Sequence, residues 1–420
     1  MGTIKSIFAR EILASGGLPS LEVEVTLNDG CMGKASVSYG ISAGSKEAFV
    51  LLDQDSKRYN GKGMLKAVAN VNEKIAPLLN GKDPFDQRGL DKIMIDADNT
   101  ENKSALGANA ILGVSMAIAR AAAKSKKLEL YEYLATCYQL QTTGYRLPKP
   151  MVVMIEGGAH ADHSTDLQEY LICSLRDDLP AKENVRMQME IYQALKTNLK
   201  KIGVSTNVGN EGAFAPNGLN SNQRPLEFLL QAVIDAGYEP GKDAGLSIDA
   251  AASEFFRDGQ YRLATEQRSL SPEKLIEMYL EWFAKYPIIT AEDMLSEFDW
   301  EHWPMLMAKA IKTKIVADDL TVTSAELLQK AIDQKAANAI LIKLNQAGTV
   351  TQTVDCCLLA KAHQITTIPS HRGGGETNDT FLVDLAVAMG SEWIKVGPTR
   401  GERVCKYNRL MKIEEILNAK

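Results

Sequence analysis

The sequence lacks any apolar run long enough to cross a membrane. Its longest mostly apolar stretch, around residues 108–119, falls short of the roughly 20 residues that a transmembrane helix requires. The first residues also lack the charged, apolar and small-residue regions of a secretory signal. We therefore expect no membrane span and a cytoplasmic location.

The sequence also lacks an excess of basic residues and any paired cysteine motif. It has 47 Lys and Arg against 53 Asp and Glu, a formal net charge of −6, whereas binding to nucleic acid needs a basic face. We therefore expect no nucleic-acid partner. No Cys-x-x-Cys pair occurs, which argues against a zinc ribbon or a thioredoxin-like site. The cysteines are expected to be buried, reduced side chains: Cys31, Cys137, Cys173, Cys356, Cys357 and Cys405.

The remaining composition is that of an ordinary globular protein. Apolar residues make up 45% and charged residues 24% of the 420 residues, a length that suggests two or three domains. The proline-containing segment 147–150 has the composition of a domain boundary. We predict an N-terminal α+β domain over residues 1–140 and a catalytic domain over residues 141–420.

The N-terminal third mixes strands and helices. Residues 21–25 alternate apolar and charged side chains, which is typical of a half-buried strand, and the Asn-Asp-Gly turn at 28–30 predicts a hairpin. With strands at 4–13 and 33–38, this predicts a three-stranded antiparallel meander. The alanine-rich segment 104–124 predicts a buried helix.

Beyond residue 150, short apolar runs recur and end in polar residues. Two early runs cover residues 151–155 and 170–174; helical patterns follow at 182–200 and 223–237. Six further runs then end at residues that lie 43, 26, 25, 28 and 24 positions apart: Asp249, Glu292, Asp318, Lys343, His371 and Lys395. An interval near 25 is long enough for a strand, a helix and two loops. Buried parallel strands read as continuous apolar runs, and eight of them close a barrel.

The longest interval contains an insertion over residues 255–270. A helix is expected to follow it, with Ser271 as N-cap and Pro272 as the first helical residue.

In such a barrel the ends of the strands converge on one mouth. Three acids, two lysines and a histidine would meet there. Carboxylates without convergent cysteines favour a hard cation such as Mg²⁺. The alternative is a structural network of salt bridges between the acids and the lysines.

Lys343 and Lys395 have different predicted roles beside such a cation. The metal charge and a second ammonium group would both lower the pKa of a lysine, so Lys343 is a candidate general base. Lys395 is a candidate for binding a substrate anion. Glu211, in a glycine-containing loop over residues 207–216, is a candidate general acid, although it would equally suit an exposed loop carboxylate.

One competing motif is present. Residues 40–44 match the Gly-x-Ser-x-Gly nucleophile elbow of hydrolases, but they follow a meander strand rather than a strand of a parallel βαβ unit. We therefore disfavour a hydrolase.

Nearly the whole chain resembles the enolase family, from Arg10-Glu11-Ile12-Leu13 to Lys412-Ile413-Glu414-Glu415. The segments that carry the resemblance are 207–216, 246–255, Glu292-Asp293, 316–323, 341–348, Ser370-His371-Arg372 and 401–408. The resemblance implies an eight-stranded β/α barrel of the ββαα(βα)6 type behind an N-terminal α+β domain. It also implies a hydro-lyase that converts 2-phosphoglycerate reversibly into phosphoenolpyruvate, a step of glycolysis.

The resemblance also implies a role for each matching residue. Two Mg²⁺ ions are expected, the first held by Asp249, Glu292 and Asp318, and the second by Ser42 together with the substrate phosphate. Lys343 matches the base and Glu211 the acid, supported by Glu169 beside Gln168. The matching substrate contacts are His160, Gln168, Glu292, Asp318, Ser370, His371, Arg372 and Lys395, with Lys395 on the carboxylate and His160 on a closing loop.

A homodimer, or a higher assembly of dimers, is implied as well. Arg10 with Glu415, and Glu22 with Lys412, match ion pairs between subunits in the family.

Several loop positions depart from the family pattern. The altered residues are Tyr39, Glu156, Asn210 and Gly373, the last in place of a serine that contacts phosphate. These changes motivate an alternative, in which a related enzyme acts on another phosphate- or phosphonate-bearing hydroxy acid. A third hypothesis is a non-catalytic binding role through the terminal Lys420.

Overall fold

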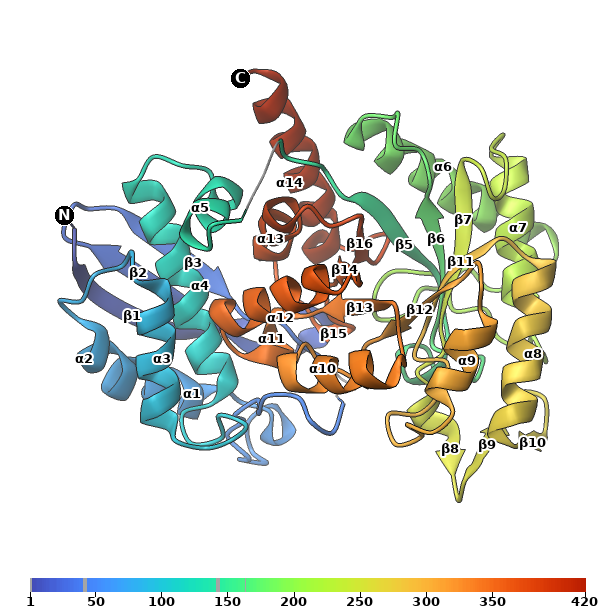
Figure 1. Cartoon of the computed structure of the whole chain (residues 1–420), viewed down its shortest axis with the longest axis horizontal. Coiled ribbons are helices and arrows are strands. Elements are labelled where there is room, and N and C mark those ends of the chain that lie inside the picture. The colour runs from blue at the N-terminus through green and yellow to red at the C-terminus, as the bar shows by residue number, and fades with distance from the viewer. Residues whose placement is uncertain (1, 41–43, 141–143, 163) are drawn as a thin grey trace.

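The computed structural model describes residues 2–40, 44–140, 144–162 and 164–420. Figure 1 shows a smaller N-terminal part beside a larger barrel, with the C-terminal helix between them at the top of the view. Among the described residues, no helix has the length and apolarity needed to cross a bilayer.

The N-terminal part is an antiparallel sheet covered by helices. Its strands are β1 (Ile4–Leu13), β2 (Pro19–Leu27) and β3 (Met32–Ser36), in that order, which confirms the predicted meander. The buried helix α4 (Ala108–Ser125) packs on this sheet, as predicted. Gly33 permits the close approach, because a Cβ atom there would lie 2.0 Å from the carbonyl oxygen of Ala117. The other helices are α1 (Leu65–Ala69), a π-turn (Asn70–Ile75), α2 (Ala76–Leu79), α3 (Gln87–Asp98) and α5 (Leu130–Cys137), with 3-10 turns at Ser15–Gly17 and Tyr59–Gly61.

An eight-stranded sheet forms the barrel. Its order is β14 (Thr366–Pro369), β13 (Ala339–Ile342), β12 (Lys314–Ala317), β11 (Ile288–Glu292), β7 (Ala244–Asp249), β6 (Glu169–Ser174), β5 (Lys149–Glu156) and β16 (Trp393–Val396). Strand β6 runs antiparallel to both neighbours, and the other pairs are parallel. A single parallel bridge between Ser370 and Lys395 brings the two edges of the sheet together. This confirms the predicted ββαα(βα)6 barrel.

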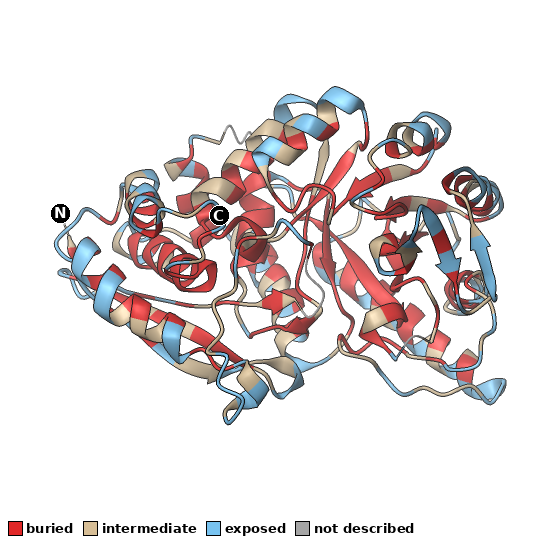
Figure 2. Ribbon diagram, turned by 90° about the horizontal axis from the view of Figure 1, so that it is seen from below, coloured by how far each residue is buried: buried red, intermediate tan, exposed pale blue. Residues whose placement is uncertain are grey.

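Helices surround the barrel strands, which are buried on both faces (Figure 2). The helices are α6 (Ala181–Lys201), α7 (Arg224–Asp235), α8 (Pro272–Lys285), α9 (Trp303–Lys309), α10 (Ala325–Gln334), α11 (Leu344–Ala347), α12 (Val350–Ala362), α13 (Phe381–Met389) and α14 (Gly401–Asn418), with 3-10 turns at Gly158–His160 and Ala252–Phe255. A separate apolar cluster, which includes Val153, Leu171 and Leu341, packs side chains from several of these strands together. These positions explain why the strands appear as uninterrupted apolar runs in the sequence.

Two smaller sheets connect these parts. The insertion forms β8 (Phe256–Arg257), β9 (Gln260–Leu263) and β10 (Arg268–Leu270), and Ser271 caps α8 through the backbone N–H of Lys274, as predicted. Strand β4 (Tyr39–Gly40) pairs with β15 (Gly374–Gly375), so the N-terminal part contacts a loop at the mouth of the barrel.

Candidate active site

The ends of the barrel strands place most of the predicted site residues around one cavity. It encloses about 490 Å³ of space not filled by protein atoms. The predicted residues on its wall are His160, Gln168, Glu169, Glu211, Asp249, Asp318, Lys343, Ser370, His371, Arg372 and Lys395. Glu292 is not among them, because it lies behind Lys395. Ser42 lies outside the described residues.

Lys395 is the centre of the acidic group. Its Nζ lies 2.8 Å from Glu169, 2.9 Å from Asp249 and 2.7 Å from Glu292. Three carboxylates therefore match the three protons of the ammonium group. Burial alone would lower the pKa of Lys395, but these carboxylates raise it well above its ordinary value. Lys395 is accordingly a fixed positive charge at the base of the site.

Lys343 is held by a single acid. Its Nζ donates to Oδ2 of Asp318, whose Oδ1 accepts the side-chain amide of Gln346 at 2.9 Å. Burial alone would lower the pKa of Lys343, but Asp318 raises it. The sequence predicts the opposite direction, under the charge of a dication. In this arrangement Lys343 is a proton donor to Asp318, and the contact has to break before Lys343 can act as a base.

The three acids predicted as metal ligands have the chemistry that a hard divalent cation requires. All three are buried, and Oε1 of Glu292 has no hydrogen-bond partner among the described residues. Burial and the adjacent Asp249 raise the pKa of Glu292 well above its ordinary value, so a positive charge here would relieve unfavourable ionisation. Asp249, Glu292 and Asp318 therefore fit Mg²⁺ through carboxylate oxygens.

Opposite these acids, two histidines and two glutamates form a second buried cluster. His160 Nδ1 lies 3.2 Å from Glu169 and 3.5 Å from Glu211, and His371 Nε2 lies 3.2 Å from Glu211. Burial alone would lower the pKa of His160, but these acids raise it to about 9. Burial alone would raise the pKa of Glu211, but His371 and His160 hold it well below its ordinary value. Glu211 is thus buried in the cavity wall rather than exposed on its loop.

The site also contains acids that were not predicted from the sequence. Asp293 accepts the backbone N–H groups of Asp318 and Asp319 at 2.9 and 2.8 Å, and so orients that turn. Oxygens of Asp293, Asp318 and Asp319 lie within 4.8 Å of one another. A signal was available, since each unpredicted acid directly follows a predicted one. Glu47, from the N-terminal part, lies 3.0 Å from Arg372, and no local pattern indicates it.

The three glycines after Arg372 are required by their surroundings. A Cβ atom at Gly373 would lie 2.5 Å from Nε2 of His160, and one at Gly375 would lie 2.6 Å from the ring of Tyr39. Gly374 has a φ of +125°, which other residues rarely adopt. The departure from the family pattern at Gly373 therefore belongs with the position of His160.

Lys420 is the predicted residue that lies away from this site. Its ammonium group contacts Glu132 of α5, so the terminal lysine already has a partner within the chain.

Comparison with known protein families gives two matches that together cover nearly the whole chain. The model described as the enolase N-terminal domain matches residues 4–134. The model described as the enolase C-terminal TIM barrel domain matches residues 144–420.

Proposed function

Since the chain belongs to the enolase family, a family of lyases, we propose that it dehydrates 2-phosphoglycerate reversibly to phosphoenolpyruvate. The observation that carries the proposal is the arrangement of one cavity. Lys343 and Lys395 lie among Asp249, Glu292 and Asp318, while Glu211 occupies the histidine-containing cluster. A base and an acid on separate groups suit removal of a proton and a hydroxyl from adjacent carbons.

In this proposal Lys343 removes the proton next to the substrate carboxylate. It must first lose its contact with Asp318, since that carboxylate raises the pKa of Lys343. Two bound Mg²⁺ ions would supply the positive charge that stabilises the resulting enediolate. Asp249, Glu292 and Asp318 would hold the first ion, and Ser42 would contribute to the second.

Glu211 then delivers a proton to the departing hydroxyl. It has to gain this proton, because His371 and His160 favour its ionised form. Glu169 supports this role through its contact with His160. The remaining substrate contacts are assigned to Lys395 at the carboxylate and to His160, Gln168, Ser370, His371 and Arg372, with Glu292 and Asp318 at the metal side.

The decisive measurement is formation of phosphoenolpyruvate from 2-phosphoglycerate by the purified chain with Mg²⁺. Activity that disappears with a chelator and returns with Mg²⁺ supports the proposal. A folded protein that gives no product under these conditions would refute it.

A second candidate is a lyase for a related phosphate- or phosphonate-bearing hydroxy acid. It is favoured by Gly373, where the ring of His160 occupies the space that a serine side chain would need. Turnover across a panel of such acids discriminates the two. A clear preference for 2-phosphoglycerate removes the second candidate.

We further propose that the chain acts in the cytoplasm as a homodimer, possibly within a larger assembly. Arg10, Glu22, Lys412 and Glu415 are the residues assigned to the contact between subunits. Within the chain, Arg10 lies 2.6 Å from Glu22, and Lys412 lies 2.9 Å from Glu415, so dimer formation would exchange these partners.

A further inference from the structure

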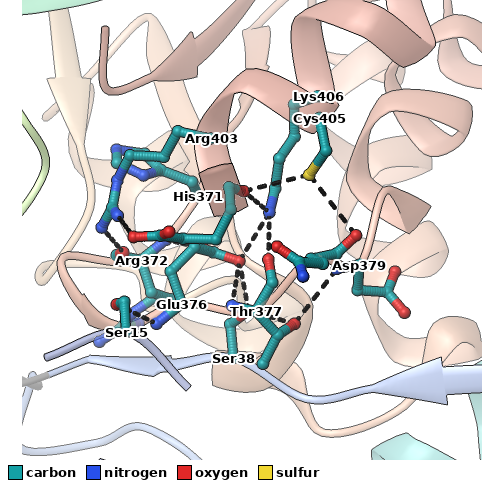
Figure 3. Close-up of polar contacts among 12 residues, drawn as sticks. Ser15, Ser38, His371, Arg372, Glu376, Thr377, Asp379, Arg403, Cys405 and Lys406 are labelled. Carbon is teal, nitrogen blue, oxygen red and sulfur yellow. Dashed lines mark hydrogen bonds and ion pairs between the residues drawn. The ribbon is translucent and has the colours of Figure 1, made fainter. Parts of the chain in front are cut away.

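A buried carboxylate outside the proposed catalytic groups lies directly behind the substrate-binding loop. Glu376 is 2% exposed and follows the three glycines after Arg372. Its Oε2 accepts the backbone N–H of Arg372 at 2.8 Å (Figure 3). Its Oε1 accepts the hydroxyl of Ser38 and the backbone N–H of Thr377. Both oxygens of Glu376 are therefore engaged, and one of them holds the peptide of a residue assigned to the substrate.

The counter-ion of Glu376 comes from the C-terminal helix. Lys406, on α14, is 1% exposed, and its Nζ lies 2.9 Å from Oε1 of Glu376. The same ammonium group donates to the carbonyl oxygens of Thr377, at 2.6 Å, and Glu402. All three of its protons are thus used. Few buried ion pairs have every donor satisfied, and the geometry of this one is correspondingly fixed.

The peptide of Arg372 is held on both sides by this arrangement. Glu376 accepts its own N–H, while Nη2 of the buried Arg403 donates to its carbonyl oxygen at 3.2 Å. The preceding residue, His371, donates its backbone N–H to the carbonyl of Lys395 at 3.1 Å. The backbone that carries His371 and Arg372 is therefore fixed by charged side chains of α14 and by the adjoining barrel strand.

The N-terminal part reaches the same carboxylate. Ser38 donates to Glu376, and Ser15 exchanges backbone and hydroxyl hydrogen bonds with the backbone of Glu376, at 2.9 and 3.0 Å. Glu376 is thus the point where the N-terminal part, α14 and the substrate-binding loop meet (Figure 3).

We propose that Glu376 and Lys406 are positioning residues, which fix the His371–Arg372 backbone in the register that binds the substrate anion. The role rests on the proposed function, and it requires a carboxylate rather than an amide. Glutamine offers a single acceptor oxygen. If its NH₂ faced Arg372, two donors would oppose each other; if it faced Lys406, the ammonium would lose its acceptor.

The test compares Glu376→Gln with Asp384→Asn. Asp384 is an equally buried acid, paired with Arg409 of α14 at the same interface, but it has no bond to the substrate-binding loop. Glu376→Gln is expected to raise KM for 2-phosphoglycerate about tenfold, the factor for losing one charge-assisted hydrogen bond, with a much smaller change in kcat. Asp384→Asn should lower the thermal midpoint without changing KM.

Hydrogen exchange provides a readout that does not depend on turnover. The backbone amides of residues 370–377 are expected to exchange faster in Glu376→Gln than in the unmodified chain, and unchanged in Asp384→Asn. Ser38→Ala, which removes only the hydroxyl donor, should shift KM and exchange in the same direction by about threefold, and it serves where Glu376→Gln does not fold.

The outcomes separate the two proposals. If the unmodified chain gives no product, the proposed function fails, whatever the exchange data show. If exchange at residues 370–377 is unchanged in both Glu376→Gln and Ser38→Ala, the positioning role is overturned. A KM that rises equally in Asp384→Asn would show a general loss of stability and would overturn it as well.

Discussion

At the scale of single residues, the two proposed proton-transfer groups start in protonation states that chemistry must reverse. Asp318 favours the charged form of Lys343, and the two histidines favour the ionised form of Glu211. Each group therefore depends on contacts that the substrate has to displace. This coupling makes the two residues separable by experiment.

Lys343→Ala should abolish exchange of the substrate's α-proton with solvent, whereas Glu211→Gln should retain exchange and lose dehydration. Each loss is expected to be about 10²- to 10⁴-fold, the usual contribution of a general acid or base. Exchange is followed in heavy water by NMR and dehydration by product formation. Lys309→Ala, at an exposed position on α9, is the control and should change neither. Equal loss of both activities in the two variants contradicts the division of roles.

Glu156 is a residue whose burial predicts a dependence of stability on pH. Its oxygens accept the backbone N–H groups of Glu211 at 3.1 Å and Ala213 at 2.8 Å. Burial and the nearby Glu211 raise the pKa of Glu156 to about 8, against about 4.3 for an exposed glutamate. Between these values the folded chain retains a proton that the unfolded chain has released. The free energy of unfolding should therefore fall as pH rises, by up to about 1.4 kcal/mol per unit.

Glu156→Gln should remove this loss, because the amide oxygen still accepts both N–H groups and carries no charge at any pH. The variant is expected to match the unmodified chain near about pH 5 and to exceed it in stability near about pH 8. Denaturant unfolding across this range measures the difference. Glu301→Gln, at an exposed acid, should show no such trend. A constant difference between Glu156→Gln and the unmodified chain would mean that Glu156 is ionised throughout.

At the scale of elements, the insertion between β7 and α8 holds the loop that carries His160 and Gln168. Asp166, in that loop, accepts the backbone N–H groups of Ala264 at 2.8 Å and of Thr265 at 3.1 Å. It also accepts the side-chain amide of Asn222 at 2.7 Å. One half-buried carboxylate therefore joins three segments that are far apart in the sequence.

Asp166→Ala should release this loop from the insertion. Losing hydrogen bonds to a charged acceptor is expected to cost about 1.5–3 kcal/mol of unfolding free energy, and to speed cleavage of residues 157–168 in limited proteolysis. KM should rise, since His160 and Gln168 lie on the loop. Asp178→Ala, at an exposed acid that pairs with Arg176, provides the control. Unchanged proteolysis of the loop would show that the insertion does not hold it.

The elements also show how far the sequence alone can predict the structure. The barrel strands were predictable, because burial on both faces leaves apolar runs that end at the site. Helix α14 has no such signal, since its buried face includes Arg403, Lys406 and Glu414 as well as apolar residues. Those charges are satisfied only by partners far away in the chain. For the same reason Glu47 and Glu376 were not predicted, whereas Asp249 and Lys343 follow from their places at the ends of strands.

At the scale of the whole molecule, both parts of the chain build the site. Glu47 contacts Arg372, and Arg120 of α4 pairs with Asp379 of the barrel at 2.8 Å. Strands β4 and β15 add backbone hydrogen bonds across the same boundary. The N-terminal part therefore orders the substrate-binding loop, and we expect the barrel alone to lack a complete site.

The assembly of two chains can be tested with a swap of charges. Arg10 and Glu415 are proposed to pair between subunits, and both are largely exposed within one chain. Arg10→Glu and Glu415→Arg should each weaken the dimer by about tenfold, more than one exposed ion pair contributes, because each creates repulsion across the interface. The double variant should recover much of the loss. Sedimentation over a dilution series measures this, with Lys92→Glu on the exposed surface of α3 as control. Additive losses in the double variant would show that the two residues do not meet.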